Sequence, residues 1–255
     1  MEIVAIIPAH LASIRFPRKI LFPFYGLPMI EHVRRRALLA DSISEVYVAT
    51  CDQEIADNVS RYGGKVIMTS DKHLNGTSRV AEAVENIECS HVILLQGDEP
   101  LLIPDDLDIF TTQILRNPQI DAWNATGPIE TKNELNRHSF VKCVISPNNR
   151  ILFCFRRTPF YSKFELQIKF VRKILGVIAY RKSFLQQLVN IPPSTLEMAE
   201  SIEQLRIIEN GFILNSVNLD HSFPSVNEPG EADIVLEYIE QNSEQKKLVK
   251  KILKS

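Results

Sequence analysis

Four short apolar runs in the first 98 residues, separated by segments of helical periodicity, constrain the fold of this chain more than any other feature. The runs are "IVAIIP" (3–8), "EVYVAT" (45–50), "KVIMTS" (65–70) and "HVILLQGD" (91–98). The first two runs are typical of strands buried on both faces, and the other two also indicate strands, the last of them ending in polar residues. Between them, apolar residues recur at helical spacing in 29–40, 51–63 and 78–87. Alternating strands and helices need right-handed crossovers, so we expect an α/β fold with a mostly parallel sheet and helices on both faces.

The second half of the chain has a different pattern. Residues 141–157 indicate two strands around a polar turn at 147–149, and 173–189 a strand that leads into a helix. A helix over 195–211 that ends at Gly211, a strand over 212–219 and a terminal helix over 230–254 complete the prediction. No repeat or linker interrupts the chain, so we expect one domain over 1–255. An inserted hairpin and helix lobe at about 125–215 would carry a substrate lobe or a dimer face.

Composition excludes several classes of protein. The net charge of −2 and the pI near 6.3 give no general case for binding nucleic acid or a membrane surface. The four cysteines form no C-x-x-C pair, which argues against a zinc site or a disulfide scaffold and suggests a reducing cytoplasm. No stretch approaches the ~18 apolar residues of a membrane span, and the first apolar run is too short for a signal peptide.

A basic, proline-stiffened loop, "AHLASIRFPRKILFPF" (9–24), follows the first predicted strand. Ligands of parallel α/β sheets bind at the carboxyl ends of the strands. Arg15 and Lys19 would therefore meet phosphate oxygens there and stabilise the charge that develops during phosphoryl or nucleotidyl transfer. The alternative is an ordinary solvated basic loop.

Two further segments carry candidate chemistry. In "LLQGDEPLL" (94–102) the acidic pair Asp98-Glu99 follows an apolar strand, a placement suited to Mg²⁺, which takes one or two carboxylates plus substrate phosphates. A surface turn with a helix cap is the alternative. In "HLNGTSR" (73–79), Asn75-Gly76 predicts a tight turn, Thr77 or Ser78 a helix cap, and Arg79 a side chain directed into the fold or at a ligand.

These motifs, taken in order with six others, resemble the 3-deoxy-manno-octulosonate (Kdo) cytidylyltransferases. The nine are "IPAHLASIRFPRKIL", "GLPMIEHV", "VATCDQEI", "MTSDKHLNGTSR", "QGDEP", "VKCV", "RTP", "GVIAYR" and "ESIEQLR". Each is weak by itself, but the match runs from residue 3 to about 235. The resemblance implies a single Rossmann-like nucleotidyltransferase domain. It also implies a Mg²⁺-dependent cytoplasmic enzyme, usually a homodimer, with neither nucleic acid nor membrane as a partner.

The implied reaction transfers CMP from CTP to the anomeric hydroxyl of an acidic sugar, Kdo or a Kdo-like ulosonic acid. Pyrophosphate is released, and the product supplies activated sugar for a surface glycan, as in lipopolysaccharide biosynthesis. By the resemblance, Arg15 and Lys19 hold the triphosphate, and Asp98 binds Mg²⁺ together with Asn227. The implied cytidine pocket comprises Pro8, Ala9, Ser13, Thr77, Arg79 and Gln96. The residues implied to face the sugar are Arg157, Tyr180, Glu203 and Gln204. From the residues alone, Tyr180 also fits a core position, and Glu203 and Gln204 also fit the solvated face of a helix.

Departures from the family pattern leave two alternatives open. The metal-site aspartate is replaced by Asn227, the glycine before the lysine by Arg18, and a histidine near the sugar strand by Ile174. With Arg156 also gained, we expect an acceptor other than ordinary Kdo: the 8-amino sugar, another ulosonic acid or a phosphonate. Arg18 would then replace part of the missing metal charge. The second alternative is a relative that binds nucleotide or sugar without transferring anything.

Overall fold

The computed structural model describes residues 2–254, which form two compact units. The first comprises the chain up to Thr112 and from Phe223 onward, and the second comprises Gln113–Ser222. The predicted lobe at about 125–215 falls within the second unit. Within the described residues, no helix combines the length and apolar character needed to cross a bilayer.

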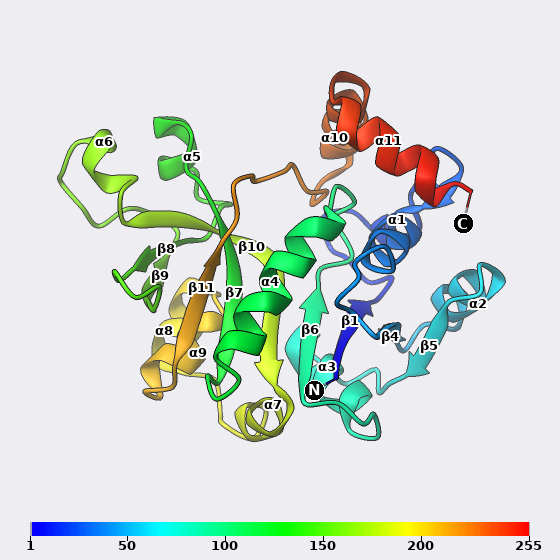
Figure 1. The fold of residues 1–255 in the computed structure, drawn as a ribbon, viewed down its shortest axis with the longest axis horizontal. Coiled ribbons are helices and arrows are strands. Elements are labelled where there is room, and N and C mark those ends of the chain that lie inside the picture. Colours follow the sequence, from blue (N-terminus) through cyan, green and yellow to red (C-terminus); the bar gives the residue numbers. More distant parts are fainter. Residues whose placement is uncertain (1, 255) are drawn as a thin grey trace. The chain divides into compact units, whose positions relative to one another are not determined.

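The first unit contains a parallel sheet in the order β6-β1-β4-β5 (Figure 1). Its strands are β1 (Ile3–Ala9), β4 (Glu45–Thr50), β5 (Lys65–Met68) and β6 (His91–Leu95), with a small hairpin of β2 (Pro23–Phe24) and β3 (Leu27–Pro28). Its helices are η1 (Lys19–Leu21), α1 (Met29–Ala37), α2 (Gln53–Arg61), α3 (Gly76–Val84), α10 (Pro229–Gln241) and α11 (Ser243–Ile252), and α4 (Pro104–Arg116) crosses the boundary in sequence. The predicted α/β fold class is confirmed.

β1 lies at the centre of this sheet and is covered on both faces. Successive side chains of a strand point to opposite faces, yet every residue of β1 except Pro8 is buried. Helices α1 and α3 pack against it. The carboxyl end of β1 is therefore held rigidly, and the basic loop starts from a fixed point.

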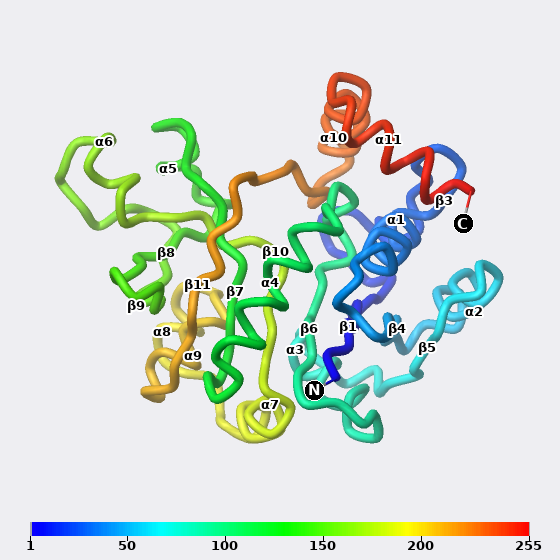
Figure 2. Tube along the Cα trace, in the orientation of Figure 1, coloured from blue at the N-terminus to red at the C-terminus, as the bar shows by residue number. Residues whose placement is uncertain are grey.

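Of the two C-terminal helices, α11 packs against α1, and α10 packs against α11 (Figure 2). Arg36 donates from Nη1 to Gln245 Oε1 at 2.8 Å, and Arg35 donates from Nη1 to the carbonyl of Ile252 at 2.6 Å. The prediction of one helix over 230–254 is wrong, because the chain breaks at Asn242. The Asn242 side chain accepts a hydrogen bond from the Gln245 backbone at 3.0 Å and starts α11 as a new helix.

The second unit is built on a mixed sheet. β11 pairs with β7 in parallel, and the pairs β7–β10, β10–β8 and β8–β9 are antiparallel. The strands are β7 (Ala122–Gly127), β8 (Lys142–Ile145), β9 (Ile151–Phe155), β10 (Val171–Arg181) and β11 (Leu214–Asn218). The helices are α5 (Lys132–Asn136), α6 (Phe164–Gln167), α7 (Lys182–Leu188), α8 (Thr195–Glu200) and α9 (Gln204–Glu209). The predicted hairpin over 141–157 is confirmed, and Asn149 takes the left-handed conformation of its turn at φ 62°.

The predicted helix over 195–211 is wrong as a single element. Ser201 takes the left-handed conformation at φ 54° and separates α8 from α9. Arg206 of α9 donates from Nε and Nη2 to the two carboxylate oxygens of Glu197 in α8, at 2.7 and 2.5 Å, and this bidentate pair holds the helices together. Glu203 and Gln204 consequently lie at the start of α9 instead of in the middle of a helix.

Buried His32 of α1 gives the first unit a pH-dependent stability. Its Nε2 donates to the Phe24 carbonyl at 2.7 Å, and burial lowers its pKa from 6.5 to about 4, with Arg36 and Arg35 contributing. The unfolded chain takes up this proton near pH 6.5 and the folded chain only near pH 4, so stability falls as pH drops between these values, by up to about 3 kcal/mol.

We expect His32→Gln to flatten this part of the stability curve, because glutamine keeps an N–H donor but does not titrate. Urea unfolding at several pH values between 7 and 4 measures the slope, and His138→Gln, at an exposed position, is the matched control. An unchanged slope in the His32 variant would assign the acid sensitivity to other groups.

Candidate functional site

The basic loop after β1 is closed on its own backbone. The Leu11 carbonyl accepts hydrogen bonds from the backbone nitrogens of Ser13 and Arg18 at 2.9 and 3.0 Å, and the Leu11 nitrogen donates to Asp52 Oδ2 at 2.8 Å. Arg18 takes the left-handed conformation at φ 63°, which explains why the resembled pattern has glycine there. Its guanidinium pairs with Glu54 at the surface. The positive charge that Arg18 was expected to offer to the phosphates is therefore already paired with the carboxylate of Glu54.

Lys19 and Asp98 form an ion pair at the carboxyl edge of the sheet. Lys19 Nζ lies 2.5 Å from Asp98 Oδ2, and their side chains are only 14% and 18% exposed. Lys19 Nζ also donates to the Val226 carbonyl at 3.2 Å, and the Val226 nitrogen donates to the Asp98 carbonyl at 2.9 Å. Three segments far apart in sequence therefore meet at one lysine.

Two glycines allow the close packing that brings these segments together. A Cβ on Gly97 would lie 2.7 Å from Ile20 Cδ1, so the buried Ile20 of η1 seats directly on the backbone before Asp98. A Cβ on Gly76 would lie 3.0 Å from Pro8 Cγ, so the first turn of α3 packs on the end of β1. The small residues thus set the position of Lys19 relative to the strand ends.

Arg15 and Asn227 face each other across the same edge. Arg15 is exposed, and its Nη2 lies 3.5 Å from Asn227 Oδ1, a long hydrogen bond. The Asn227 nitrogen donates to Glu231 Oε2 at 2.7 Å and its Nδ2 donates to Ser225 Oγ at 3.1 Å, so the residue is fixed ahead of α10. The carboxylate of Asp98 and the amide oxygen of Asn227 therefore lie on adjoining segments.

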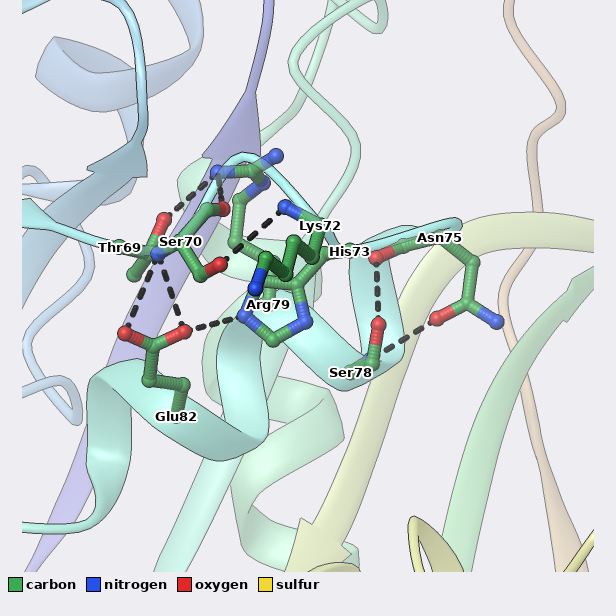
Figure 3. A network of polar contacts seen from close by, with 8 residues as sticks. All are labelled: Thr69, Ser70, Lys72, His73, Asn75, Ser78, Arg79 and Glu82. Carbon is green, nitrogen blue, oxygen red and sulfur yellow. Dashed lines mark hydrogen bonds and ion pairs between the residues drawn. The ribbon is translucent and has the colours of Figure 1, made fainter.

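Arg79 anchors the segment between β5 and α3 (Figure 3). Only 4% exposed, it donates from Nη1 to Thr69 Oγ1 at 2.6 Å and to the Ser70 carbonyl at 3.3 Å. Glu82 of α3 accepts a hydrogen bond from the Ser70 nitrogen and another from His73. The hydrogen bond with His73 is the main cause that lowers the pKa of Glu82. Arg79 and Glu82 of α3 thus hold the 69–75 loop in place. This structural role leaves open the predicted contact of Arg79 with the nucleotide.

The cap of α3 is Asn75, and the prediction that Thr77 or Ser78 fills this role is wrong. Asn75 Oδ1 accepts a hydrogen bond from the Ser78 nitrogen at 2.9 Å, and Ser78 Oγ donates back to the Asn75 carbonyl at 3.1 Å. The helix begins at Gly76, two residues before the predicted start, because Asn is among the strongest capping residues.

The remaining nucleotide candidates surround the same edge in the first unit. Pro8 and Ala9 end β1, Ser13 lies in the basic loop, Thr77 in the first turn of α3, and Gln96 just after β6. Ala9 is buried and Gln96 is exposed, while the other three are half-buried. The structure thus gathers the predicted nucleotide residues in one unit, although their contacts to a nucleotide stay a prediction.

The sugar candidates lie in the second unit, where Arg157 follows β9 and is exposed. Its neighbour Arg156 is structural, contrary to the expectation that it alters the acceptor site. Arg156 donates from Nε to the Glu200 carbonyl at 2.9 Å and from Nη2 to the Ser201 carbonyl at 3.0 Å. These are the last carbonyl of α8 and the carbonyl of its C-cap residue, and basic side chains commonly satisfy carbonyls at the end of a helix.

Lys142 is a buried residue that sequence reasoning missed. Its Nζ donates to the carbonyls of Arg137 at 2.7 Å, Phe140 at 2.8 Å and Arg156. Burial, with a smaller effect of Arg156, lowers the Lys142 pKa to about 8. The three N–H donors of the ammonium group each meet a carbonyl, which fixes the chain immediately before Arg157. The only sequence signal was a lysine within the "VKCV" strand.

Tyr180, Glu203 and Gln204 lie around the start of α9. Tyr180 is 2% exposed in β10, and the pKa of nearby Arg206 is raised mainly by Glu197, with smaller effects of Glu203 and Tyr180. Glu203 is exposed, and half-buried Gln204 donates from Nε2 to Asn124 Oδ1 at 2.9 Å. Tyr180 therefore has a core position as well as its predicted role.

The geometry of the first unit suits charge stabilisation at a phosphate chain. A lysine and an arginine stand beside a carboxylate at the end of parallel strands, where nucleotides bind in such sheets. Cations stabilise a leaving pyrophosphate, and a carboxylate holds a hard divalent cation.

Comparison with known proteins agrees with this arrangement. The family model described as cytidylyltransferase matches residues 4–219. A 3-deoxy-manno-octulosonate cytidylyltransferase of Geobacter sulfurreducens is 36% identical over 247 residues, covering 93% of this chain and 99% of that protein. An 8-amino-3,8-dideoxy-manno-octulosonate cytidylyltransferase of Shewanella piezotolerans is 37% identical over 234 residues, covering 90% of this chain and 95% of that protein.

A solved structure agrees as well. The structure of CMP:2-keto-3-deoxy-manno-octonic acid synthetase complexed with CTP superposes with a TM-score of 0.88 at 33% identity, covering 94% of this chain and 99% of that one. With the family model matched over most of the sequence and relatives above 30% identity along nearly the whole chain, this protein belongs to the cytidylyltransferase family.

Proposed function

We propose that the protein transfers CMP from CTP to a Kdo-type acidic sugar and releases pyrophosphate. The observation that carries the proposal is the Lys19–Asp98 pair at the carboxyl edge of the parallel sheet, with Arg15 on the same edge. The full-length similarity to enzymes named for this reaction supports it. The acceptor's anomeric oxygen would form a bond to the α-phosphorus, the bond from that phosphorus to the α,β-bridging oxygen would break, and the acceptor would lose one proton.

In this proposal each charged residue has a separate task. Lys19 Nζ, held between Asp98 and the Val226 carbonyl, would meet the β- and γ-phosphates as negative charge builds on the leaving group. Arg15 would bind the same phosphates from the exposed side of the loop. Arg157 would pair with the carboxylate of the sugar acid, since a guanidinium binds a carboxylate through two parallel hydrogen bonds.

The residues fit Mg²⁺. A carboxylate from Asp98 and an amide oxygen from Asn227 are hard oxygen ligands on adjoining segments, and Mg²⁺ takes few protein ligands when substrate phosphates supply the others. Bound there, Mg²⁺ would neutralise charge on the phosphates and help to orient them. Because Asn227 contributes no charge, the metal would be held more weakly than by two carboxylates.

We expect CTP to be the preferred nucleotide, by at least about tenfold in kcat/KM over UTP, ATP and GTP, because a pocket that hydrogen-bonds one base leaves polar groups unpaired with another. The support is the arrangement of Arg79, Gln96 and the end of β1 at one edge. A pyrophosphate-release assay compares the four nucleotides at equal concentration with Mg²⁺ and a sugar acid. Equal or better use of a purine nucleotide would refute this assignment.

The same assay identifies the acceptor. Curated relatives at 36% and 37% identity carry the names of Kdo and of 8-amino-Kdo enzymes, so both acids belong in the panel, with sialic-type acids and simple phosphonates. The departures at Asn227 and Ile174 favour an acceptor other than unmodified Kdo. If Kdo proves the best substrate, that half of the proposal is wrong and CMP transfer itself stands.

We also propose a cytoplasmic homodimer that supplies activated sugar for a surface glycan. The second unit exposes large apolar side chains, among them those of Leu152, Tyr161 and Leu166. These side chains support the predicted role of the second unit in dimerisation. Light scattering at assay concentration measures the mass, and a monomer would contradict this part.

A further inference from the structure

A single buried amide in β7 connects three parts of the second unit. Asn124 is fully buried, and its Nδ2 donates to the carbonyls of Leu175 at 2.9 Å, Val177 at 3.3 Å and Ala125 at 2.9 Å. Its Oδ1 accepts from Gln204 Nε2 at 2.9 Å. Both ends of the side chain are therefore engaged, one with the backbone of β10 and β7 and the other with α9.

The backbone contacts arise from an irregularity in β10. Ile174 pairs with Thr126 and Ile178 pairs with Asn124, so β10 carries two more residues than β7 over this stretch. A bulge of this kind disrupts the regular ladder and leaves backbone groups that need other partners. Asn124 supplies the donor for the carbonyls on either side of Gly176, and this fixes which end of its amide faces β10.

The orientation of Asn124 in turn fixes that of Gln204. Carbonyl oxygens only accept hydrogen bonds, so the end of Asn124 that meets them is the NH₂ group and the opposite end is an oxygen. That oxygen requires a donor from Gln204, which is its NH₂ group. The Gln204 carbonyl oxygen is consequently turned away from Asn124, on a side chain that is half-buried at the start of α9.

We propose that Asn124 is a positioning residue that fixes the Gln204 amide so that it offers its carbonyl oxygen to a hydrogen-bond donor, a hydroxyl or ammonium group, of the acceptor acid. The inference rests on the proposed function, in which Gln204 faces the sugar. Without Asn124 the Gln204 amide can rotate. When it turns its NH₂ group toward the acceptor acid, the hydrogen of the acceptor's donor group has no oxygen to bond.

The test is a double-mutant cycle of Asn124→Leu and Gln204→Met, read as KM for the acceptor against KM for CTP. We expect each single variant to raise the acceptor KM by about tenfold, the scale of one lost hydrogen bond, and to leave the CTP KM within about twofold. The acceptor KM of the double variant is expected to be no higher than the higher of the two single-variant values, because both substitutions remove the same interaction.

Thr126→Val is the matched structural control. Thr126 is also fully buried in β7 and bonds Ser216 Oγ, Asn218 Oδ1 and Arg172 Nε at 2.7, 3.0 and 2.9 Å, and none of these three bonds involves Gln204. If Thr126→Val raises the acceptor KM as much as Asn124→Leu does, the effect is general loosening of β7 and the proposal fails.

Two other outcomes would overturn it. Additive effects in the cycle, or Gln204→Met with an unchanged acceptor KM, would refute the role of Asn124 while the parent enzyme still transfers CMP. Should Asn124→Leu not fold, Gln204→Met and Gln204→Glu decide: both leave the Asn124 contacts with β10 in place, and both are expected to raise the acceptor KM. A parent that releases no pyrophosphate with any acid would instead refute the proposed function, and this inference with it.

Discussion

Replacing Lys19 with alanine is expected to lower kcat by about 10²–10³-fold, the scale of losing one group that stabilises charge in a transition state. Lys19 Nζ lies 2.5 Å from Asp98 Oδ2 at the carboxyl edge of the sheet, and nucleotide phosphates bind at this position in such folds. The side chain packs little apolar surface, so the variant should fold. Pyrophosphate release measures kcat, and circular dichroism checks the fold.

Lys72→Ala is the control for this prediction, because Lys72 is an exposed lysine of the same unit. Its kcat should equal that of the parent within a few fold. If Lys19→Ala also retains activity within a few fold, Lys19 has no part in the chemistry. Unfolding of Lys19→Ala would mean that the pair with Asp98 serves stability.

Replacing Asp98 with asparagine is expected to lower activity by at least about 10²-fold and to raise the Mg²⁺ concentration needed for half-maximal rate. A neutral amide is a much weaker ligand for a hard dication than a carboxylate, and charge stabilisation by such a metal is worth several kcal/mol. With Asn227 already neutral, the variant would leave no charged ligand in the proposed pair. A Mg²⁺ titration of the initial rate measures both effects.

Asp105→Asn, at an exposed position in the first turn of α4, controls for the loss of a negative charge in the same unit. Unchanged activity and Mg²⁺ dependence in Asp98→Asn would place the metal elsewhere. Because Asp98 also pairs with Lys19, a lower rate at an unchanged Mg²⁺ requirement would assign its role to holding the lysine.

The first unit was predictable because its local patterns agree with its tertiary environment. β1, β4 and β6 are apolar runs that the structure buries for the most part, and the polar residues that follow them lie at the carboxyl edge as expected. The proximity of Lys19 and Asp98 followed from the topology rule for parallel sheets. The ion pair itself, and its contact with the segment before α10, depend on close packing at Gly97 that no local pattern encodes.

The second unit was harder to predict because long-range contacts decide its structure. β7 was not predicted, since the buried Asn124 and Thr126 interrupt its apolar pattern. The break at Ser201 depends on Arg156 and on the Arg206–Glu197 pair, and helical periodicity continues through it. The break at Asn242 did have a signal: an Asn with Gln three residues later is a capping pattern.

In the proposed reaction, CTP is cleaved between its α- and β-phosphates and the CMP part is transferred to an acid. Phosphorus NMR of one reaction with CTP, Mg²⁺ and the best acceptor of the panel follows both events. We predict that the α-phosphorus signal of CTP converts to that of a phosphodiester, in equal amount with free pyrophosphate. Release of inorganic phosphate from the γ-position, or an unchanged CTP spectrum with every acid, would contradict the proposed reaction.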